Sequence, residues 1–172
     1  MNNKIELKTK KILLREIEYS DIKNVYKGLS DSKVIKHYGV SFHSLEETKE
    51  QMEWFAKEEQ KWFAICSLDN EEFYGAGGLN DISKMHKKAE IGLWLLPDYW
   101  GKGIMKEAME IICNFGFEKL NLHRIEGFVD SENVKCKKAM SKIDFELEGT
   151  MRDCEIKNDK YVSVDIYSRL KK

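Results

Sequence analysis

The chain has 172 residues, and its 29 basic and 30 acidic side chains leave a formal net charge of −1. This near-neutral balance gives no electrostatic reason to expect a nucleic acid or an anionic membrane as a partner. The hydrophobic fraction of 42% excludes a disordered chain. We therefore expect one domain spanning residues 1–172, large enough to bury a core without disulfide or metal staples.

The cysteines and histidines argue against a metal site. No two of the four cysteines form a C-x-x-C pair, and the four histidines lack the spacing of metal ligands. The N-terminal residues contain no continuous apolar stretch of the kind a signal peptide needs, and no segment approaches the roughly 18 apolar residues of a membrane-spanning helix. These features predict no metal, no membrane contact, and a cytoplasmic protein with reduced thiols.

The first half of the chain carries both strand and helix patterns. A short alternating run predicts a strand at 11–18. Two helices follow: Ser20 is the expected N-cap of one that reaches about residue 29, and a capping box at Ser44 opens another that reaches about residue 59. Two apolar runs joined by a polar turn then predict an antiparallel hairpin with strands at 62–68 and 73–79.

The second half predicts a mixed sheet. An apolar run ending at Leu96, where Pro97 stops it, predicts a strand near the centre of the sheet. The expected elements are a strand at 89–96, a helix at 104–119, a strand at 123–129, a helix at 133–142, and two strands at 145–156 and 161–170 around a turn at Asn158-Asp159. This order, with a β-α-β unit in its middle, indicates an α/β fold.

Residues 89–109 combine a buried strand, a glycine turn and an amphipathic helix. The first turn of a helix leaves backbone N–H groups unpaired and carries partial positive charge. Gly101 and Gly103 lack the Cβ atoms that would keep an anion away from those donors. Lys102 between them either adds a charge contact or points to solvent. The turn therefore favours a ligand that carries phosphate.

Other phosphate motifs fit this turn poorly. A Walker A loop needs Gly-Lys-Ser/Thr after its spacer, whereas Gly103 is followed by Ile104. A dinucleotide fingerprint needs a third glycine where Lys106 stands, and the preceding hairpin disagrees with a doubly wound parallel sheet. A plain strand-to-helix turn and a nucleotide-binding domain remain as alternatives at this point.

The whole chain resembles the GNAT superfamily of acetyl-CoA-dependent N-acetyltransferases, and within it the branch that contains the ribosomal-protein alanine and serine N-acetyltransferases. The most specific element is the AEIG strand followed by P-x-Y-W-G-K-G; HRIEGFVDSEN and FELEGTMRD match at the right spacings. The resemblance implies a mixed, mostly antiparallel central sheet of about seven strands with flanking helices. It also implies that the sheet splays at the strand ending at Leu96, and that acetyl-CoA is the cosubstrate.

The resemblance assigns cofactor contacts to three segments. The backbone of the splayed strand would pair with the pantetheine arm, through Trp94, Leu95 and Leu96. The glycine turn would hold the pyrophosphate, through Trp100, Gly101, Lys102, Gly103, Ile104, Met105 and Lys106. Asn133 would lie beside the pantetheine, followed by Cys136, which replaces the usual serine of this segment.

Two residues are candidates for catalysis. Glu90 is the candidate general base, acting through a water on an ammonium that must lose a proton before attack; the alternative is a solvated or salt-bridged strand residue. Cys136 either donates to the departing thiolate or only packs near the cofactor. Some relatives use a tyrosine at the position of Met140, so that mechanism is not expected here. A backbone N–H near Leu95 or Leu96 would stabilise the oxyanion.

The acceptor is expected to be a primary amine. A protein N-terminus is the first hypothesis and a small amine, such as a polyamine, amino sugar or antibiotic, is the second. By the resemblance, His37, Tyr38 and His86 lie near the acceptor pocket. A non-catalytic sensor of acyl-CoA is the competing class of function, and either a monomer or a homodimer is compatible with the sequence.

Overall fold

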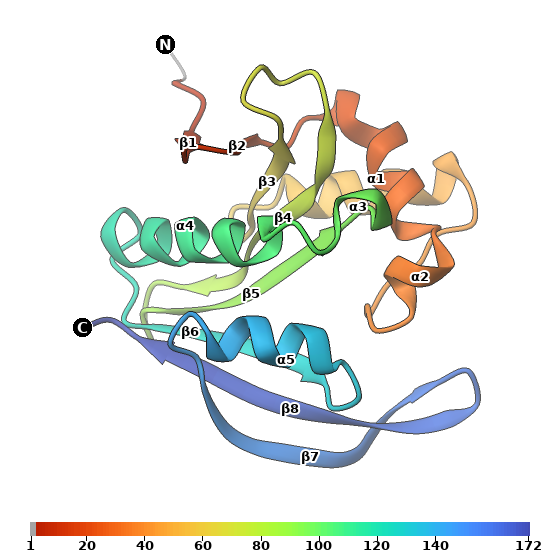
Figure 1. Ribbon diagram of the computed structural model, residues 1–172, viewed down its shortest axis with the longest axis vertical. Coiled ribbons are helices and arrows are strands. Elements are labelled where there is room, and N and C mark those ends of the chain that lie inside the picture. The colour runs from red at the N-terminus through yellow and green to blue at the C-terminus, as the bar shows by residue number, and fades with distance from the viewer. Residues whose placement is uncertain (1–2) are drawn as a thin grey trace.

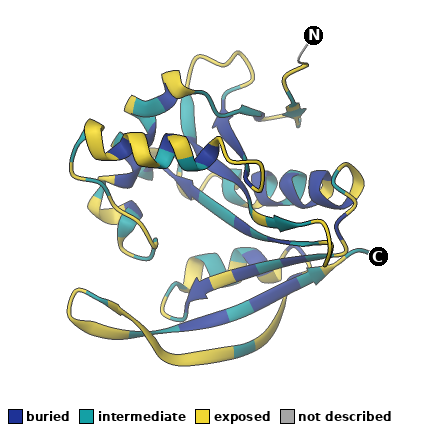
Figure 2. Ribbon diagram, turned by 180° about the vertical axis from the view of Figure 1, so that it is seen from behind, coloured by how far each residue is buried: buried dark blue, intermediate teal, exposed yellow. Residues whose placement is uncertain are grey.

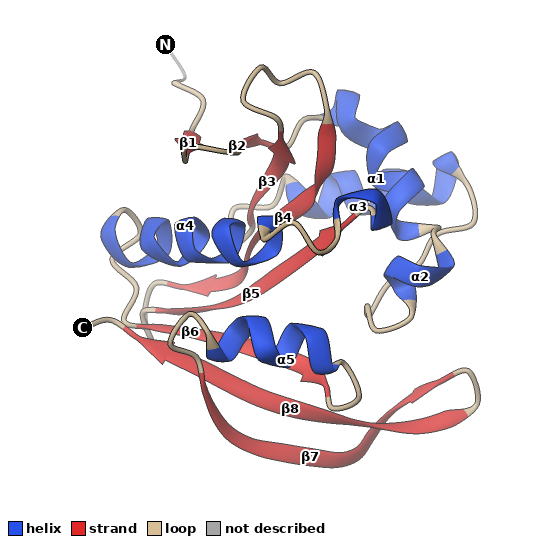
Figure 3. Ribbon diagram, in the orientation of Figure 1, coloured by secondary structure: helices blue, strands red, loops and turns tan. Residues whose placement is uncertain are grey.

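The computed structural model describes residues 3–172 as an eight-stranded sheet flanked by helices (Figures 1 and 3). The strand order is β1-β2-β3-β4-β5-β6-β8-β7. The strands are β1 (Glu6–Lys8), β2 (Leu13–Glu16), β3 (Lys61–Cys66), β4 (Phe73–Ser83), β5 (Lys88–Leu95), β6 (Arg124–Asp130), β7 (Glu146–Lys157) and β8 (Lys160–Leu170). The α-helices are α1 (Ile22–Leu29), α2 (Ser32–Ile35), α3 (Leu45–Phe55), α4 (Ile104–Glu118) and α5 (Val134–Ser141).

The pair β5–β6 breaks the antiparallel pattern of the sheet. These two strands are parallel, and they pair over only three residues, from Lys88↔Arg124 to Glu90↔Glu126. Beyond that point they diverge, as Figure 1 shows. The expected mixed, mostly antiparallel sheet is confirmed, and its opening lies between β5 and β6.

Two hydrophobic cores cover the two faces of the sheet, because alternate side chains of a strand point to opposite faces. Phe63 of β3 and Leu95 of β5 lie in the core beneath α4 and α5. Their chain neighbours Trp62 and Trp94 lie in the second core, which packs against α1, α2 and α3. The buried faces of the helices are dark in Figure 2. Among residues 3–172, no helix has the length and apolar character that crossing a bilayer requires.

Several local expectations need correction. The strand β1 was not predicted, because at three residues with only Leu7 partly buried it carries no periodicity, so the sheet has one strand more than expected. The short helix α2 was also missed; the side chain of Asp31 caps it by accepting from two backbone N–H groups. Ser20 is not the cap of α1: it lies inside a 3₁₀ turn, Tyr19–Asp21, that Glu18 and Asp21 close with a capping box.

The helix α3 begins as expected but ends early. The hydroxyl of Ser44 accepts from the N–H of Glu47, while the carboxylate of Glu47 accepts from the N–H of His43 instead of that of Ser44. The helix stops at Phe55, four residues before the expected end at about residue 59. The chain then enters β3 at Lys61, so the Trp54 and Trp62 rings meet edge to face, with centroids 6.0 Å apart.

Strand β7 forms one edge of the sheet and is exposed along its length (Figure 2). It pairs only with β8, and its register shifts twice, between Leu147 and Gly149 and between Met151 and Glu155. The two strands are joined by Asn158 and Asp159, both with positive φ, at the turn that the sequence predicts. This hairpin curves over the sheet opening, where Glu155 and Lys157 approach the loop before α3.

The contact between Gly28 of α1 and Trp94 of β5 provides a test of the second core. A Cβ atom on Gly28 would lie 2.0 Å from a ring carbon of Trp94. Gly28→Ala should therefore lower the free energy of unfolding by about 2 kcal/mol through overpacking, although alanine normally favours a helix. Urea denaturation measures this. Gly39→Ala is the matched control, since nothing lies within 4 Å of its Cβ position, and an equal loss in both variants would contradict the packing argument.

Candidate functional site

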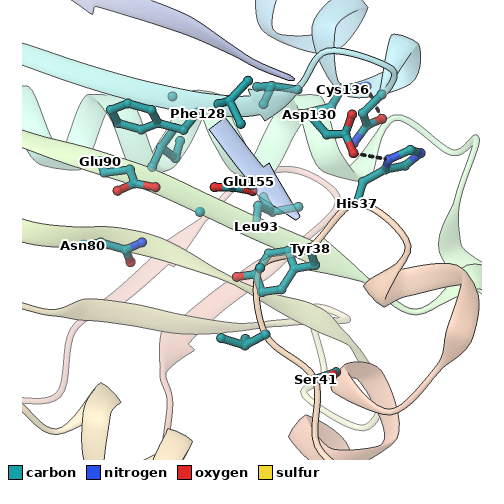
Figure 4. A pocket seen from close by; sticks show the side chains of 18 of the residues that line it. His37, Tyr38, Ser41, Asn80, Glu90, Leu93, Phe128, Asp130, Cys136 and Glu155 are labelled. Atoms are coloured by element: carbon teal, nitrogen blue, oxygen red, sulfur yellow. Dashed lines mark hydrogen bonds and ion pairs between the residues drawn. The ribbon is translucent and has the colours of Figure 1, made fainter. Parts of the chain in front are cut away.

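A cavity of about 790 Å³ occupies the opening between β5 and β6. One wall is β5 from Glu90 to Leu93, and the opposite wall is β6 from Gly127 to Asp130. The loop at 37–42 also lines it, and α4 and the start of α5 contribute Met105, Asn133 and Cys136. Figure 4 shows labelled side chains of β5, β6, α5 and the loop at 37–42 around one space. Residues far apart in sequence thus converge where the sheet stops pairing.

The backbone of β5 presents alternate residues to this cavity. The N–H of Leu96 donates to the carbonyl oxygen of Tyr74 on β4, at 2.8 Å. In an antiparallel ladder with Leu95 opposite Gly75, Trp94 and Leu96 therefore direct their backbone groups to β4. The N–H of Leu96 is therefore already paired and not free for the pantetheine or oxyanion contact expected of it, and Trp94 has the same orientation. The residues that face the opening are Leu93, which sequence reasoning missed, and Leu95.

Trp100 occupies one of the backbone hydrogen-bonding groups at the end of β5. Its indole N–H donates to the carbonyl oxygen of Leu95 at 2.9 Å. Of the backbone groups of Leu95, the N–H remains directed toward the opening. The Trp100 ring is in turn covered by the ammonium of Lys135, which lies 5.5 Å from the ring centroid. Trp100 therefore joins the end of β5 to α5 and does not line the cavity.

The glycine turn has the open geometry that an anion site requires. Gly101 and Gly103 both have positive φ, 74° and 77°, and no heavy atom lies within 4 Å of either Cβ position. Gly103 is the N-cap of α4, so the N–H groups of the next three residues have no helical acceptor. Those residues are Ile104, Met105 and Lys106. Lys102 lies over the ring of Tyr99, 5.5 Å from its centroid.

The turn lies between two hollows. Met105 lines the large cavity, while Gly103 and Lys106 line a second one of about 570 Å³ on the other side of α4. This second hollow also contacts Thr9 and Lys11 of the β1–β2 connection. A ligand on the turn would therefore enter the β5–β6 opening along the side of α4 that carries Met105.

Asn133 and Cys136 occupy the first turn of α5. The side-chain oxygen of Asn133 accepts from the N–H of Cys136 at 3.2 Å, so Asn133 is the N-cap. Both residues line the cavity. Burial raises the pKa of the Cys136 thiol to about 11. The thiol is therefore protonated at neutral pH, where it acts as a weak donor and not as a nucleophile.

Glu90 lies at the last position where β5 pairs with β6. Burial, followed by the nearby carboxylates of Asp81 and Glu126, raises its pKa to about 7. It lines the cavity, beside Asn80 on β4, whose side-chain oxygen is held 2.6 Å from the indole nitrogen of Trp62. A carboxylate with this pKa exchanges protons readily at neutral pH, as a general base does.

Of the three residues expected near the acceptor, the structure places two in the cavity. His37 and Tyr38 line it, and the Nδ1 atom of His37 lies 2.9 Å from Oδ2 of Asp130 (Figure 4). Burial and the carboxylate of Glu90 raise the pKa of Tyr38. His86 lies in the β4–β5 turn, exposed and outside the lining of both hollows. Its backbone N–H donates to the hydroxyl of Ser83 at 3.1 Å.

Acidic and aromatic side chains that sequence reasoning did not assign to the site also line the cavity. Glu50 of α3 and Glu155 of β7 contribute carboxylates, and Trp54 and Trp62 contribute rings. Among residues 3–172, no group of three or more potential ligand side chains is arranged to hold a metal ion.

Comparisons with known proteins all find acetyltransferases. A family model described as Acetyltransferase (GNAT) domain matches residues 11–146. The chain is 30% identical to an uncharacterized N-acetyltransferase, p20 of Bacillus licheniformis, over 96% of each chain. It is 25% identical to spermidine N(1)-acetyltransferase of Escherichia coli, over 81% of this chain and 75% of that one. A structure of the ribosomal-protein α-N-acetyltransferase RimL with coenzyme A superposes with a TM-score of 0.86, at 21% identity, over 96% of this chain and 98% of that one.

The pKa of Glu90 offers a test that needs no substrate. Asp81→Asn removes one of the like charges that disfavour ionised Glu90, so the pKa should fall from about 7 toward the ordinary value and remain above it, because burial is the larger cause. Asparagine tolerates the positive φ of this position and keeps the oxygen that accepts from Gln60. Carboxyl NMR titration measures the shift, with Asp98→Asn at the other end of β5 as control. An unchanged titration of Glu90 would show that Asp81 has no such influence.

Proposed function

Since the chain belongs to the acetyltransferase (GNAT) family and is an acetyl-CoA-dependent N-acetyltransferase, we propose that it acetylates a small amine carrying more than one positive charge. The observation that supports this acceptor is the lining of the cavity around Glu90. Glu50 and Glu155 add two carboxylates to it, against the one ammonium of Lys157, which lies 3.8 Å from Glu155. Trp54 and Trp62 add aromatic faces. Carboxylates and aromatic faces both attract ammonium groups.

We place the cofactor along the axis from the glycine turn to Glu90. The N–H groups of Ile104, Met105 and Lys106 hold the pyrophosphate, with Gly101 and Gly103 leaving room for it. The pantetheine arm fills the opening, where its amides pair with the gap-facing edge of β5, at Leu93 and Leu95. Asn133 and Cys136 border it from α5.

The reaction then requires the acceptor to lose a proton before it attacks the thioester carbonyl. Glu90 accepts that proton through a water, and its raised pKa suits a base that works near neutral pH. With the N–H of Leu95 paired to the pantetheine, the N–H of Leu93 is the donor available to the oxyanion. The protonated thiol of Cys136 can donate weakly to the departing thiolate, which needs little help because thiols have pKa values near 8.5.

Relatives support either type of acceptor. One relative is named a spermidine acetyltransferase, and a structural neighbour is named a ribosomal-protein acetyltransferase. A protein N-terminus brings a single α-amine on an uncharged backbone, whereas a polyamine brings a second ammonium for Glu155 or Glu50. The excess of carboxylates in the lining therefore favours the polycationic acceptor for this chain.

Replacing the proposed base should change the pH dependence of the reaction. In the wild type, kcat/KM should rise with pH through about 7, because only ionised Glu90 accepts a proton. Glu90→Gln should lower the rate about a hundredfold or more, and it should remove this rise. The affinity for CoA should stay unchanged, which calorimetry checks. A mutant with the wild-type pH profile would leave Glu90 as an ordinary strand residue.

Release of CoA thiol on a panel of amines tests the acceptor. With acetyl-CoA, kcat/KM for spermidine or 1,4-diaminobutane should exceed that for butylamine by about tenfold, and the preference should shrink as salt is added. Glu155→Gln should reduce this preference. Its matched control is Glu146→Gln, which lies on the same strand outside the cavity lining.

Each other outcome of this panel has a distinct meaning. Faster turnover of a peptide with a free N-terminus would contradict the polycationic acceptor while leaving the transferase intact. Binding of CoA without turnover of any amine would support the sensor of acyl-CoA instead.

A further inference from the structure

The contact between His37 and Asp130 bridges the cavity, and the proposed chemistry does not use it. Nδ1 of His37 lies 2.9 Å from Oδ2 of Asp130, and the two residues are 93 positions apart in the chain. The Asp130 side chain is 5% exposed and that of His37 is 24% exposed. Figure 4 shows the pair spanning from the loop before α3 to the end of β6.

Asp130 is held firmly on the cofactor side. Its second carboxylate oxygen accepts from the N–H of Glu132 at 2.9 Å, and its carbonyl oxygen accepts from the N–H of Asn133 at 2.8 Å. This turn delivers Asn133 to its place as N-cap of α5. Although burial opposes it, the hydrogen bonds from His37 and Glu132 lower the pKa of Asp130. Asp130 is therefore ionised at neutral pH, and His37 must donate.

The loop that carries His37 has few other attachments. Residues 39–41 are exposed, and the recorded backbone bonds of the loop are from Tyr38 to Ile35, at 3.1 Å, and from Phe42 to Leu29, at 3.0 Å. Both of these bonds lead to α1 and α2, on the loop's own side of the cavity. The contact of His37 with Asp130 ties the loop to the opposite wall. Tyr38, the next residue, packs against the second core and lies near enough to Glu90 to be influenced by its charge.

We propose that His37 is a positioning residue for the acceptor: by donating to Asp130, it fixes the loop at 37–42 across the cavity and holds Tyr38 in the lining that also contains Glu90. This inference rests on the proposed function, since it takes the space beside Glu90 as the place of the acceptor amine. His37 itself does not touch the reacting atoms. Its loss should weaken binding of the acceptor and leave the glycine turn and the CoA affinity unchanged.

Steady-state kinetics of His37→Ala tests the proposal. The KM for spermidine should rise about tenfold, because a hydrogen bond to a charged group is lost, while kcat at saturation should change less than about threefold. His37→Gln keeps an N–H donor and should recover part of the loss. His43→Ala is the matched control: it lies at the other end of the same loop, exposed, and only its backbone has recorded partners. This control should match the wild type.

Hydrogen exchange at 37–42 gives a readout that does not depend on turnover. Exchange should be faster in His37→Ala than in the wild type or His43→Ala, while exchange in α5 stays unchanged. An unaltered KM together with unaltered exchange would overturn the proposal, as would an equal effect in His43→Ala. If exchange is faster in His37→Ala but the wild-type protein turns over no amine, the proposed function fails while the role of His37 in holding the loop stands.

Discussion

The short parallel pairing of β5 with β6 is the constraint on which the site depends. Three residue pairs join the strands, and then the sheet opens. Because β4 occupies the other side of β5, every second residue of β5 beyond the last pair with β6 directs its backbone groups into the opening. Trp100 satisfies the carbonyl of Leu95, and the other groups are left to a ligand or water. The helices α4 and α5 lie on one face of the divergence, so their first turns border the same space, at Met105 and Asn133. Backbone N–H groups thus supply hydrogen-bond donors around the opening, and no side chain is needed for that purpose.

The position of Glu90 follows from the same constraint. It sits at the last paired position, buried enough to raise its pKa, and Glu126 directly across the pair adds a like charge. Glu126 itself stays ionised, since Arg124 and Lys88 hold its carboxylate at 2.9 and 3.2 Å. The two carboxylates of one strand pair therefore have opposite tendencies: one is stabilised as an anion by cations, and the other is left to exchange its proton with the cavity.

Sequence patterns predict what is local in this molecule. The glycine turn and the capping residue Ser44 were expected from neighbours along the chain, and the resemblance added the mostly antiparallel arrangement of the mixed sheet. The direction of the backbone at Leu93 and Leu96 could not be predicted, because it depends on the register between β4 and β5. Glu50 and Glu155 were missed because they reach the cavity from elements about 100 residues apart, through curvature of the β7–β8 hairpin that no local pattern encodes. Likewise, nothing near His37 indicates that its partner is Asp130.

The exposed edge formed by β7 has a consequence for solubility. A strand of 12 residues with free backbone groups is a template onto which another chain can add, and Leu147 and Ile156 are more than half exposed on it. Two register shifts break the regular spacing of its outer hydrogen-bonding groups, and charges such as Arg152 and Asp153 would be desolvated by a stacked neighbour. Glu155 is one of these protecting charges and also faces the cavity. Resistance to fibrous self-association and the lining of the cavity are therefore coupled through one side chain, and substitutions there are constrained from both sides.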